Sequence, residues 1–143
     1  MHTVQQILNR KDSDAVWSVK PDNTVYEAIA EMADKRAGAL LVMDGSKLAG
    51  IISERDYTRG IILKGRMSKE TLVKEIMSSK VITVSPSDGV EYSLGVMTDH
   101  HIRHLPVVDN GKVIGVVSIG DLVKDVIDHQ QSTIEQLENY IRG

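Results

Sequence analysis

The sequence predicts a mixed α/β (α+β) fold built from two copies of one β-α-β-β-α unit. When the 143-residue sequence is shifted by 65 residues, the stretch 16–56 lies over 81–121 without a gap. Both copies show the same order of strand and helix signals, as an internal repeat requires. The length suits one ordinary domain or two very small ones, and the repeat decides for two. The identical pairs include Val19/Val84, Pro21/Pro86, Gly50/Gly115, Ser53/Ser118 and Asp56/Asp121.

Each copy opens with a short apolar run bounded by proline, which predicts a strand at 16–19 and another at 81–84. A helix follows in both. In the first copy Thr24 and Glu27 have the spacing of a capping box, in which the two residues satisfy each other's backbone N–H groups. In the second copy apolar residues from Val90 onward recur less regularly at helical spacing.

Two strands joined by a hairpin turn come next in each copy. The connections contain Asp-Gly and Asn-Gly. Such pairs favour tight hairpin turns because glycine, asparagine and aspartate adopt positive φ with little strain. A second helix then begins at Ser53 in the first copy and at Ser118 in the second. The strands predicted in this way are 39–43, 48–52, 105–108 and 113–117.

A single unit of this size buries too little surface on folding to be more than marginally stable by itself. We therefore expect the two repeats to pack sheet to sheet with pseudo-twofold symmetry, creating two clefts at their seam, where small ligands tend to bind. The expected division is 1–66, with an amphipathic helix at 3–10, and 67–143, with a helix at 70–77.

The C-terminal tail predicts one more helix. Ser132 and Glu135 have capping-box spacing, and Ile134, Leu137 and Ile141 follow at helical spacing. A helix folded back on its own core is slightly favoured, and a dimer contact is the alternative.

Composition narrows the function. A net charge of −3 and 3% aromatic residues argue against nucleic-acid binding. No apolar run approaches the roughly 20 residues of a membrane span, and the N-terminus lacks a secretory pattern. With no cysteine, a cytoplasmic location is the default expectation. The sequence offers no nucleophile motif and no metal-ligand set, since its neighbouring histidines lack partners of suitable spacing. We expect no catalytic residue and no metal.

The repeated Ser-x-x-Asp is the first candidate binding element. Taken singly, Ser53 with Asp56 would be only a helix cap. The same pair recurs as Ser118 and Asp121 at the same point of the second repeat. A short carboxylate there can accept both hydroxyls of a ribose, and the N–H groups of the helix start favour a nearby anion.

Arg103 and His104 form the second candidate element, a phosphate grip, because arginine binds phosphate bidentately and histidine adds a donor. The matching residues of the first repeat are Gly38 and Ala39, so the two clefts should differ. If each cleft draws on both repeats, Asp56 shares a ligand with Arg103 and His104, and Asp121 depends on other cations. Arg55 and Arg59 are candidate extra contacts.

These residues carry a family resemblance. The runs 38–44 and 48–57 resemble the first half of a tandem cystathionine β-synthase (CBS) domain pair, and 102–109 and 115–122 resemble the second half. The resemblance covers about 5–130, and the tail is similar to that of stand-alone bacterial members. Asp88-Gly89 departs from the usual acidic-plus-threonine pattern.

The resemblance implies a regulatory module that binds AMP, ADP, ATP, NAD(H) or S-adenosylmethionine and works as a homodimer. It implies that backbone groups of each first strand read the adenine, here at Val16, Trp17, Val81 and Ile82. It assigns the ribose to Asp56 and Asp121 and phosphate to Arg103 and His104.

Three hypotheses compete. The first is a sensor of adenine nucleotides that acts on an unknown regulated protein. The second is a protein-interaction adaptor whose clefts are vestigial. The third, an enzyme acting on nucleotides, is disfavoured because the sequence shows no evident nucleophile or metal cluster.

Overall fold

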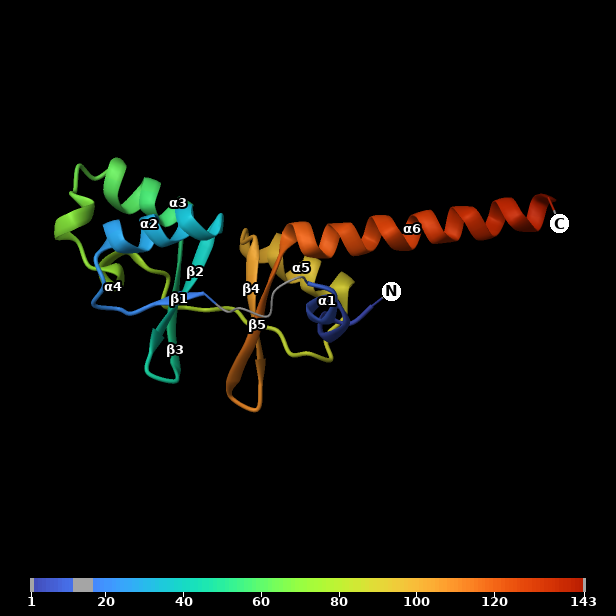
Figure 1. The fold of residues 1–143 in the computed structure, drawn as a ribbon, viewed down its shortest axis with the longest axis horizontal. Helices are drawn as coiled ribbons and strands as arrows, with labels where there is room; N and C mark the ends of the chain where they lie inside the picture. Colours follow the sequence, from blue (N-terminus) through green and yellow to red (C-terminus); the bar gives the residue numbers. More distant parts are fainter. Residues whose placement is uncertain (1, 12–16, 143) are drawn as a thin grey trace. The chain divides into compact units, whose positions relative to one another are not determined.

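The computed structural model describes residues 2–11 and 17–142, and their contacts divide the chain into two compact units (Figure 1). One, which we call the Asp56 unit, is Ala15–Ile82. The other, the Asp121 unit, joins Met1–Asp14 to Thr83–Gly143. These units, defined by contacts, do not coincide with the expected sequence halves 1–66 and 67–143. The boundary between those halves remains a prediction about where the two sequence repeats divide.

The Asp56 unit has a three-stranded sheet in the order β1-β2-β3, with β1 parallel and β3 antiparallel to β2. Buried apolar side chains from the sheet, from α2 and from α4 form its core, and Trp17 packs against them. Its elements are β1 (Ser18–Val19), α2 (Val25–Lys35), β2 (Ala39–Asp44), β3 (Lys47–Ser53), α3 (Glu54–Tyr57), the π-helical η1 (Thr58–Ile62), the 3-10 helix η2 (Ser68–Glu70) and α4 (Val73–Ile76).

The Asp121 unit repeats this order with a smaller sheet, in which β4 and β5 pair antiparallel. The strand expected at 81–84 was wrong in extent: Val84 alone forms an isolated parallel bridge, to Val107. That bridge is the counterpart of Val19 beside Val42 in β1 and β2. The elements are α1 (Val4–Arg10), α5 (Val90–His100), β4 (His104–Asp109), β5 (Lys112–Ser118) and α6 (Ile119–Arg142).

Local sequence explains the boundaries of these elements. Thr24 caps α2, its hydroxyl accepting from the Glu27 N–H at 3.1 Å while the Glu27 carboxylate accepts from the Thr24 N–H. The capping box is thus confirmed. Gly45 turns the first hairpin with φ 62°, and Asn110 and Gly111 turn the second with φ 51° and 78°. Asparagine and glycine adopt these left-handed φ values with little strain, which explains why Asn-Gly stands at a hairpin turn. The helix expected at 70–77 is shorter, covering only Val73–Ile76.

A second internal repeat, which the 65-residue shift did not reveal, explains how the units are composed. Residues 3–11 match 72–80 at an offset of 69, with Val4/Val73, Ile7/Ile76 and Lys11/Lys80 identical. The Val4 N–H donates to Asp88 O at 2.8 Å, and the Val73 N–H donates to Asn23 O at the same distance. The segment that precedes each sequence repeat is therefore hydrogen-bonded to the chain just before the first helix of the other repeat. In keeping with this, α1 packs against β5 and α6, and α4 packs against β3.

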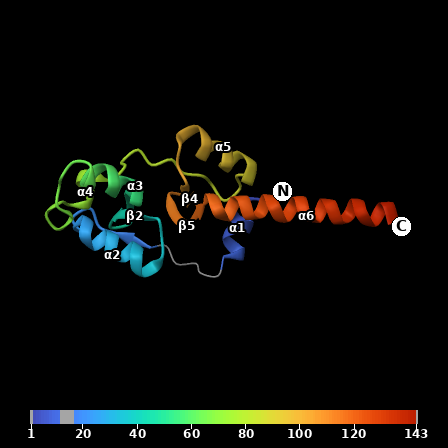
Figure 2. The ribbon, with the colours of Figure 1, turned by 90° about the horizontal axis from the view of Figure 1, so that it is seen from above.

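Helix α6 corrects the expectation for the C-terminal tail. It runs from Ile119 to Arg142 without a break at Ser132, so the predicted capping box does not start a helix. Figures 1 and 2 show its C-terminal half running past α1 and α5, and all residues of 127–142 are exposed. The slightly favoured alternative, a helix folded back on its core, is therefore wrong.

Candidate functional site

Ser53 and Asp56 form a closed hydrogen-bonded pair where β3 passes into α3. The Asp56 N–H donates to Ser53 Oγ at 3.2 Å. In return Asp56 Oδ2 accepts from the Ser53 N–H at 2.9 Å and from the Ser53 hydroxyl at 3.1 Å. This capping box fixes the carboxylate at the N-terminus of a helix, where the helix dipole favours negative charge.

Ser118 and Asp121 repeat the arrangement where β5 passes into α6. The Asp121 N–H donates to Ser118 Oγ at 3.1 Å, and Asp121 Oδ2 accepts from the Ser118 N–H at 2.9 Å. The structural role expected of each Ser-x-x-Asp is thus present in both units. A capping box and a ligand contact are compatible, because a carboxylate has about four acceptor positions.

Lys11 is a site residue that the sequence analysis missed. Its Nζ donates to Asp121 Oδ2 at 2.9 Å and to the backbone Val116 O at 2.9 Å. Lys11 is the C-cap of α1, which packs beside β5 and α6 in the same unit. No sequence signal marked it, because the 69-residue repeat pairs Lys11 with Lys80, which is exposed.

The electrostatics of Asp121 follow from these contacts. Burial raises the pKa of its carboxyl, but the backbone hydrogen bond from Ser118 and the hydrogen bond and charge of Lys11 outweigh burial and hold the pKa below 3.8. Asp121 is therefore ionised at neutral pH and holds a lysine beside it.

Gly38 and Arg103 occupy equivalent backbone positions, as the 65-residue shift predicts. The Glu54 N–H donates to Gly38 O at 3.1 Å, and the Ile119 N–H donates to Arg103 O at 2.9 Å. Arg103 is exposed, and the partly buried His104 pairs across β4 and β5 with Ser118. The structure thus brings both cationic candidates beside the capping box of their own repeat.

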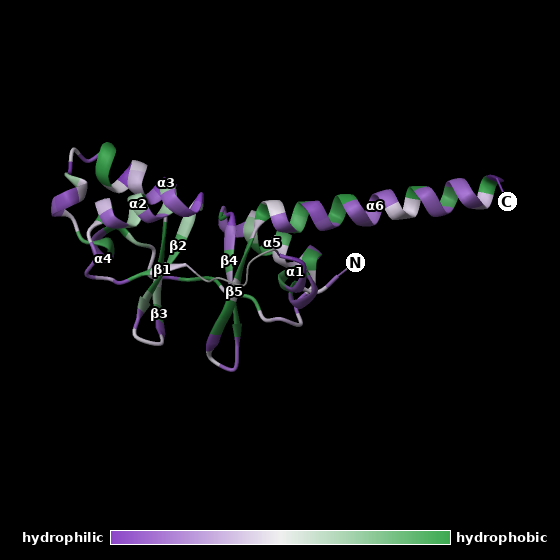
Figure 3. Ribbon diagram, viewed as in Figure 1, coloured by the Kyte–Doolittle hydropathy of each residue, from purple (hydrophilic) through white to green (hydrophobic). Residues whose placement is uncertain are grey.

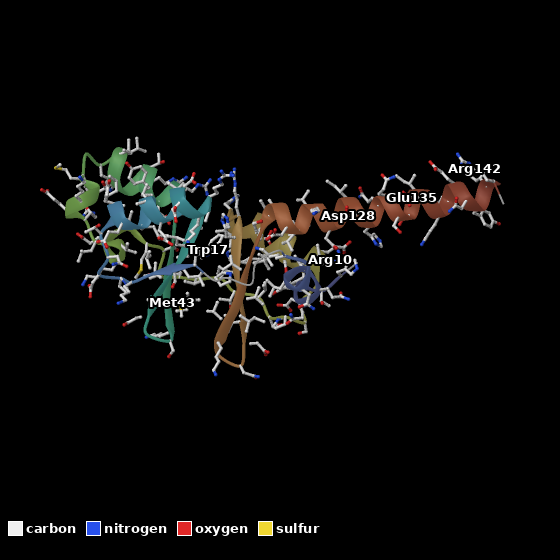
Figure 4. The ribbon with its side chains drawn as sticks, viewed as in Figure 1. Arg10, Trp17, Met43, Asp128, Glu135 and Arg142 are labelled. Carbon is white, nitrogen blue, oxygen red and sulfur yellow. The ribbon has the colours of Figure 1, made fainter. Side chains whose placement is uncertain are left out.

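The other predicted residues lie at several places. Arg55 in α3 and Arg59 in η1 are exposed, four residues apart on one helical run, and they flank Asp56 in the sequence. Trp17 is partly buried against the core of the Asp56 unit, and its carbonyl accepts from the Leu41 N–H (Figure 4). Val81 and Ile82 are partly buried residues at the end of that unit, and Val16 lies outside the described residues.

An open hollow of about 600 Å³ lies in the Asp56 unit, at the hairpin end of β2. Ser53 pairs with Ala39 at the opposite end of that strand. Lysines and aspartates both line the hollow, so it has no marked charge, and we assign no ligand to it. Its lining residues are Ser18, Val19, Lys20, Pro21, Asp22, Asn23, Met43, Asp44, Gly45 and Lys74.

Two absences hold for the described part of the chain. Within residues 2–11 and 17–142, no three His, Asp or Glu side chains gather as a metal-binding group. Over the same ranges, none of the helices combines the length and the apolar character needed to cross a bilayer.

Comparison with known proteins agrees with the doubled unit. The model of the CBS domain matches twice, at residues 5–62 and 73–128. The chain therefore belongs to the CBS-domain family, whose tandem pairs are regulatory modules.

Individual relatives cover nearly the whole chain. The mitochondrial CBS domain-containing protein CBSX3 of Arabidopsis thaliana is 43% identical, over 99% of this chain and 72% of its own length. The structure of a proposed signal-transduction protein with CBS domains from Burkholderia ambifaria superposes with a TM-score of 0.88 at 50% identity, covering 90% of this chain and 96% of that one. A CBS domain protein from Pyrobaculum aerophilum, solved in complex with AMP, gives a TM-score of 0.75 at 27% identity, with 84% and 89% coverage.

Proposed function

We propose that this chain is a cytoplasmic regulatory module that binds adenine nucleotides or related adenine compounds and has no catalysis of its own. The observation that carries the proposal is the doubled capping box, which holds Asp56 and Asp121 at equivalent helix starts. The AMP complex of the Pyrobaculum relative supports this class of ligand. The candidate ligands are AMP, ADP, ATP, NAD(H) and S-adenosylmethionine, and the module pairs as a homodimer.

The proposal gives each residue a role. Asp56 and Asp121 accept the ribose hydroxyls, and Arg103 and His104 contact phosphate. Lys11 is a further candidate phosphate contact, because its ammonium lies beside Asp121. The sequence analysis expected the phosphate of a ligand at Asp121 to depend on cations other than Arg103 and His104, and Lys11 is a specific candidate for such a cation. Backbone groups near Trp17, Val81 and Ile82 read the adenine.

Calorimetric titration with AMP, ATP, NAD and S-adenosylmethionine tests the proposal. The variant combining Asp56→Ala and Asp121→Ala should weaken binding by about 10- to 100-fold for each site, the loss expected for a hydrogen bond to a charged group. Glu27→Ala is a matched control, since it opens the capping box of α2 and removes no proposed ligand contact. No binding at millimolar ligand, or equal affinity in the double variant, would contradict the proposal.

A protein-interaction adaptor is the second candidate, favoured by the exposed apolar side chains of α6. It predicts that a regulated partner is retained equally with and without nucleotide. Incubating the pure protein with ATP and looking for product tests the enzyme alternative directly.

A further inference from the structure

Helix α6 carries an apolar stripe that the rest of the described chain does not cover. Its members follow one another at alternating intervals of four and three residues, a heptad pattern. Figure 3 shows the resulting alternation of green and purple along the helix. Its apolar members are Val123 (40% exposed), Ile127 (58%), Ile134 (49%), Leu137 (59%) and Ile141 (82%), and the polar Gln130 occupies the remaining position of the stripe.

The opposite side of α6 holds it to the Asp121 unit. Leu122 is fully buried, and the side chain of Asp125 is 1% exposed, where it accepts hydrogen bonds from Arg10 and His2. If Ile127 is a heptad a position, Asp125 is an f position, which faces directly away from the a/d seam. Because Leu122 and Asp125 hold the first turns of α6 against the Asp121 unit, the stripe on the opposite side of the helix faces away from that unit.

A helix with this stripe in water lacks the packing that normally stabilises helices. Most helical stability in proteins comes from burying an apolar face against a neighbour rather than from helix propensity. Residues 127–142 are all exposed, and Asp128, Glu135 and Arg142 mark the polar surface outside the stripe (Figure 4). Packing against a second helix would bury the stripe and stabilise this part of α6.

We propose that α6 pairs with α6 of a second copy of this chain, as a parallel two-stranded coiled coil over Val123–Ile141. This names the surface for the homodimer in the proposed function and rests on that pairing alone, not on nucleotide binding. Isoleucine occupies every a position (Ile127, Ile134, Ile141), and β-branched residues at a with Leu137 at d favour two parallel strands.

The flanks and the single polar core position are self-complementary, as a two-fold interface requires. In a parallel pair, g residues meet e residues five positions further along the partner. Val126 thus meets Gln131, and Thr133 meets Glu138, so no like charges oppose each other. Gln130 meets its own copy, where the two amides can hydrogen-bond, and a polar residue in the seam specifies register.

Disulfide trapping in the full chain tests the pairing, since the natural sequence has no cysteine. Leu137→Cys should form a disulfide-linked dimer on mild oxidation, because parallel in-register strands place it against itself. Asn139→Cys, on the polar side of the helix, is the control and should remain monomeric on a non-reducing gel. Cross-linking only in a mixture of Ile127→Cys with Leu137→Cys would show antiparallel strands and overturn the parallel arrangement.

Sedimentation provides an independent measurement. Ile134→Glu should weaken self-association by about a hundredfold or more, because each copy loses a buried apolar contact and gains an unpaired charge. Gln136→Glu adds the same charge outside the stripe and should leave the association constant unchanged. A dimer that persists equally in Ile134→Glu would overturn the proposal while leaving both homodimerisation and nucleotide binding intact. A monomeric unmodified protein would overturn both the coiled coil and the homodimer of the proposed function, and would leave nucleotide binding untouched.

Discussion

Lys11 Nζ lies 2.9 Å from Asp121 Oδ2, so a residue at the end of the first helix reaches a carboxylate 110 positions later in the chain. The pair is partly buried, with side-chain exposures of 34% for Lys11 and 26% for Asp121. The carboxylate proposed to hold a ribose in the Asp121 unit thus carries a cation before any ligand arrives. A nucleotide at this position must share Asp121 with Lys11 or displace the ammonium.

We expect the Lys11–Asp121 pair to make stability depend on pH in the acid range. The folded-state pKa of Asp121 is lowered, so its contribution is present above the unfolded value near 3.8 and is lost as pH falls through the folded value. Lys11→Met should therefore lower the free energy of unfolding at pH 7 by up to about 1 kcal/mol, and by less at pH 3, which lies below the unfolded pKa. Urea unfolding at both pH values measures the difference.

Lys80→Met is the matched control for that experiment. Lys80 is the exposed counterpart of Lys11 in the 69-residue repeat. Its substitution should leave the free energy of unfolding nearly the same at both pH values. If Lys11→Met lost equal stability at pH 7 and pH 3, the ion pair would not be the cause.

Gly50 and Gly115 occupy equivalent positions but should not tolerate alanine equally. A Cβ at Gly50 would lie 2.7 Å from the backbone Ser78 O and 2.7 Å from Met77 Sδ. At Gly115 the nearest atom is Leu8 Cδ2 at 2.8 Å, the end of a flexible side chain that can move. We expect Gly50→Ala to destabilise by about 1–3 kcal/mol and Gly115→Ala by less. Equal losses in thermal or urea unfolding would contradict this reasoning.

The N-terminal residues His2 and Arg10 should stabilise the fold through their contacts with the buried carboxylate of Asp125. Its Oδ1 accepts from Arg10 Nη1 at 2.9 Å and from His2 Nδ1 at 2.6 Å, whereas the buried Oδ2 lacks a hydrogen-bond partner among the described residues. Arg10→Met leaves this buried charge poorly compensated and should cost about 1–3 kcal/mol in urea unfolding.

Gln5→Met, on the exposed side of the same helix, is the control and should change stability little. If Arg10→Met unfolded at the same urea concentration as the unmodified protein, the Asp125 contacts would contribute no net stability. Asp125→Asn separates charge from shape, because it removes the buried charge and keeps a side chain of nearly the same size.

The expectation that Asp56 and Arg103 serve one ligand can be tested by a double-mutant cycle with AMP. If they share it, Asp56→Ala and Arg103→Ala should be non-additive, with a coupling energy of about 0.5–3 kcal/mol. Asp121→Ala combined with Arg103→Ala should then be additive. The reverse pattern would assign Arg103 to the ligand of its own repeat.

Sequence reasoning reached the repeated unit, because hydrophobic pattern, hairpin turns and capping pairs are local signals. It also placed Ser53 with Asp56 and Ser118 with Asp121, since a capping box needs only a three-residue spacing. It could not find Lys11 beside Asp121, because that contact depends on how α1 packs against β5. It also misjudged Ser132: a capping pair starts a helix only where the preceding chain is not already helical, and α6 continues through it.

The crossed placement of α1 and α4 has a consequence for dissecting the protein. A cut after residue 66 would leave α1 on the fragment 1–66, although α1 packs against β5 and α6. It would leave α4 on the fragment 67–143, although α4 packs against β3. The fragments should be poorly folded when purified separately and should regain structure when mixed, as in split-protein complementation. A gene duplication that doubled one such unit would thereby have made its two copies mutually dependent.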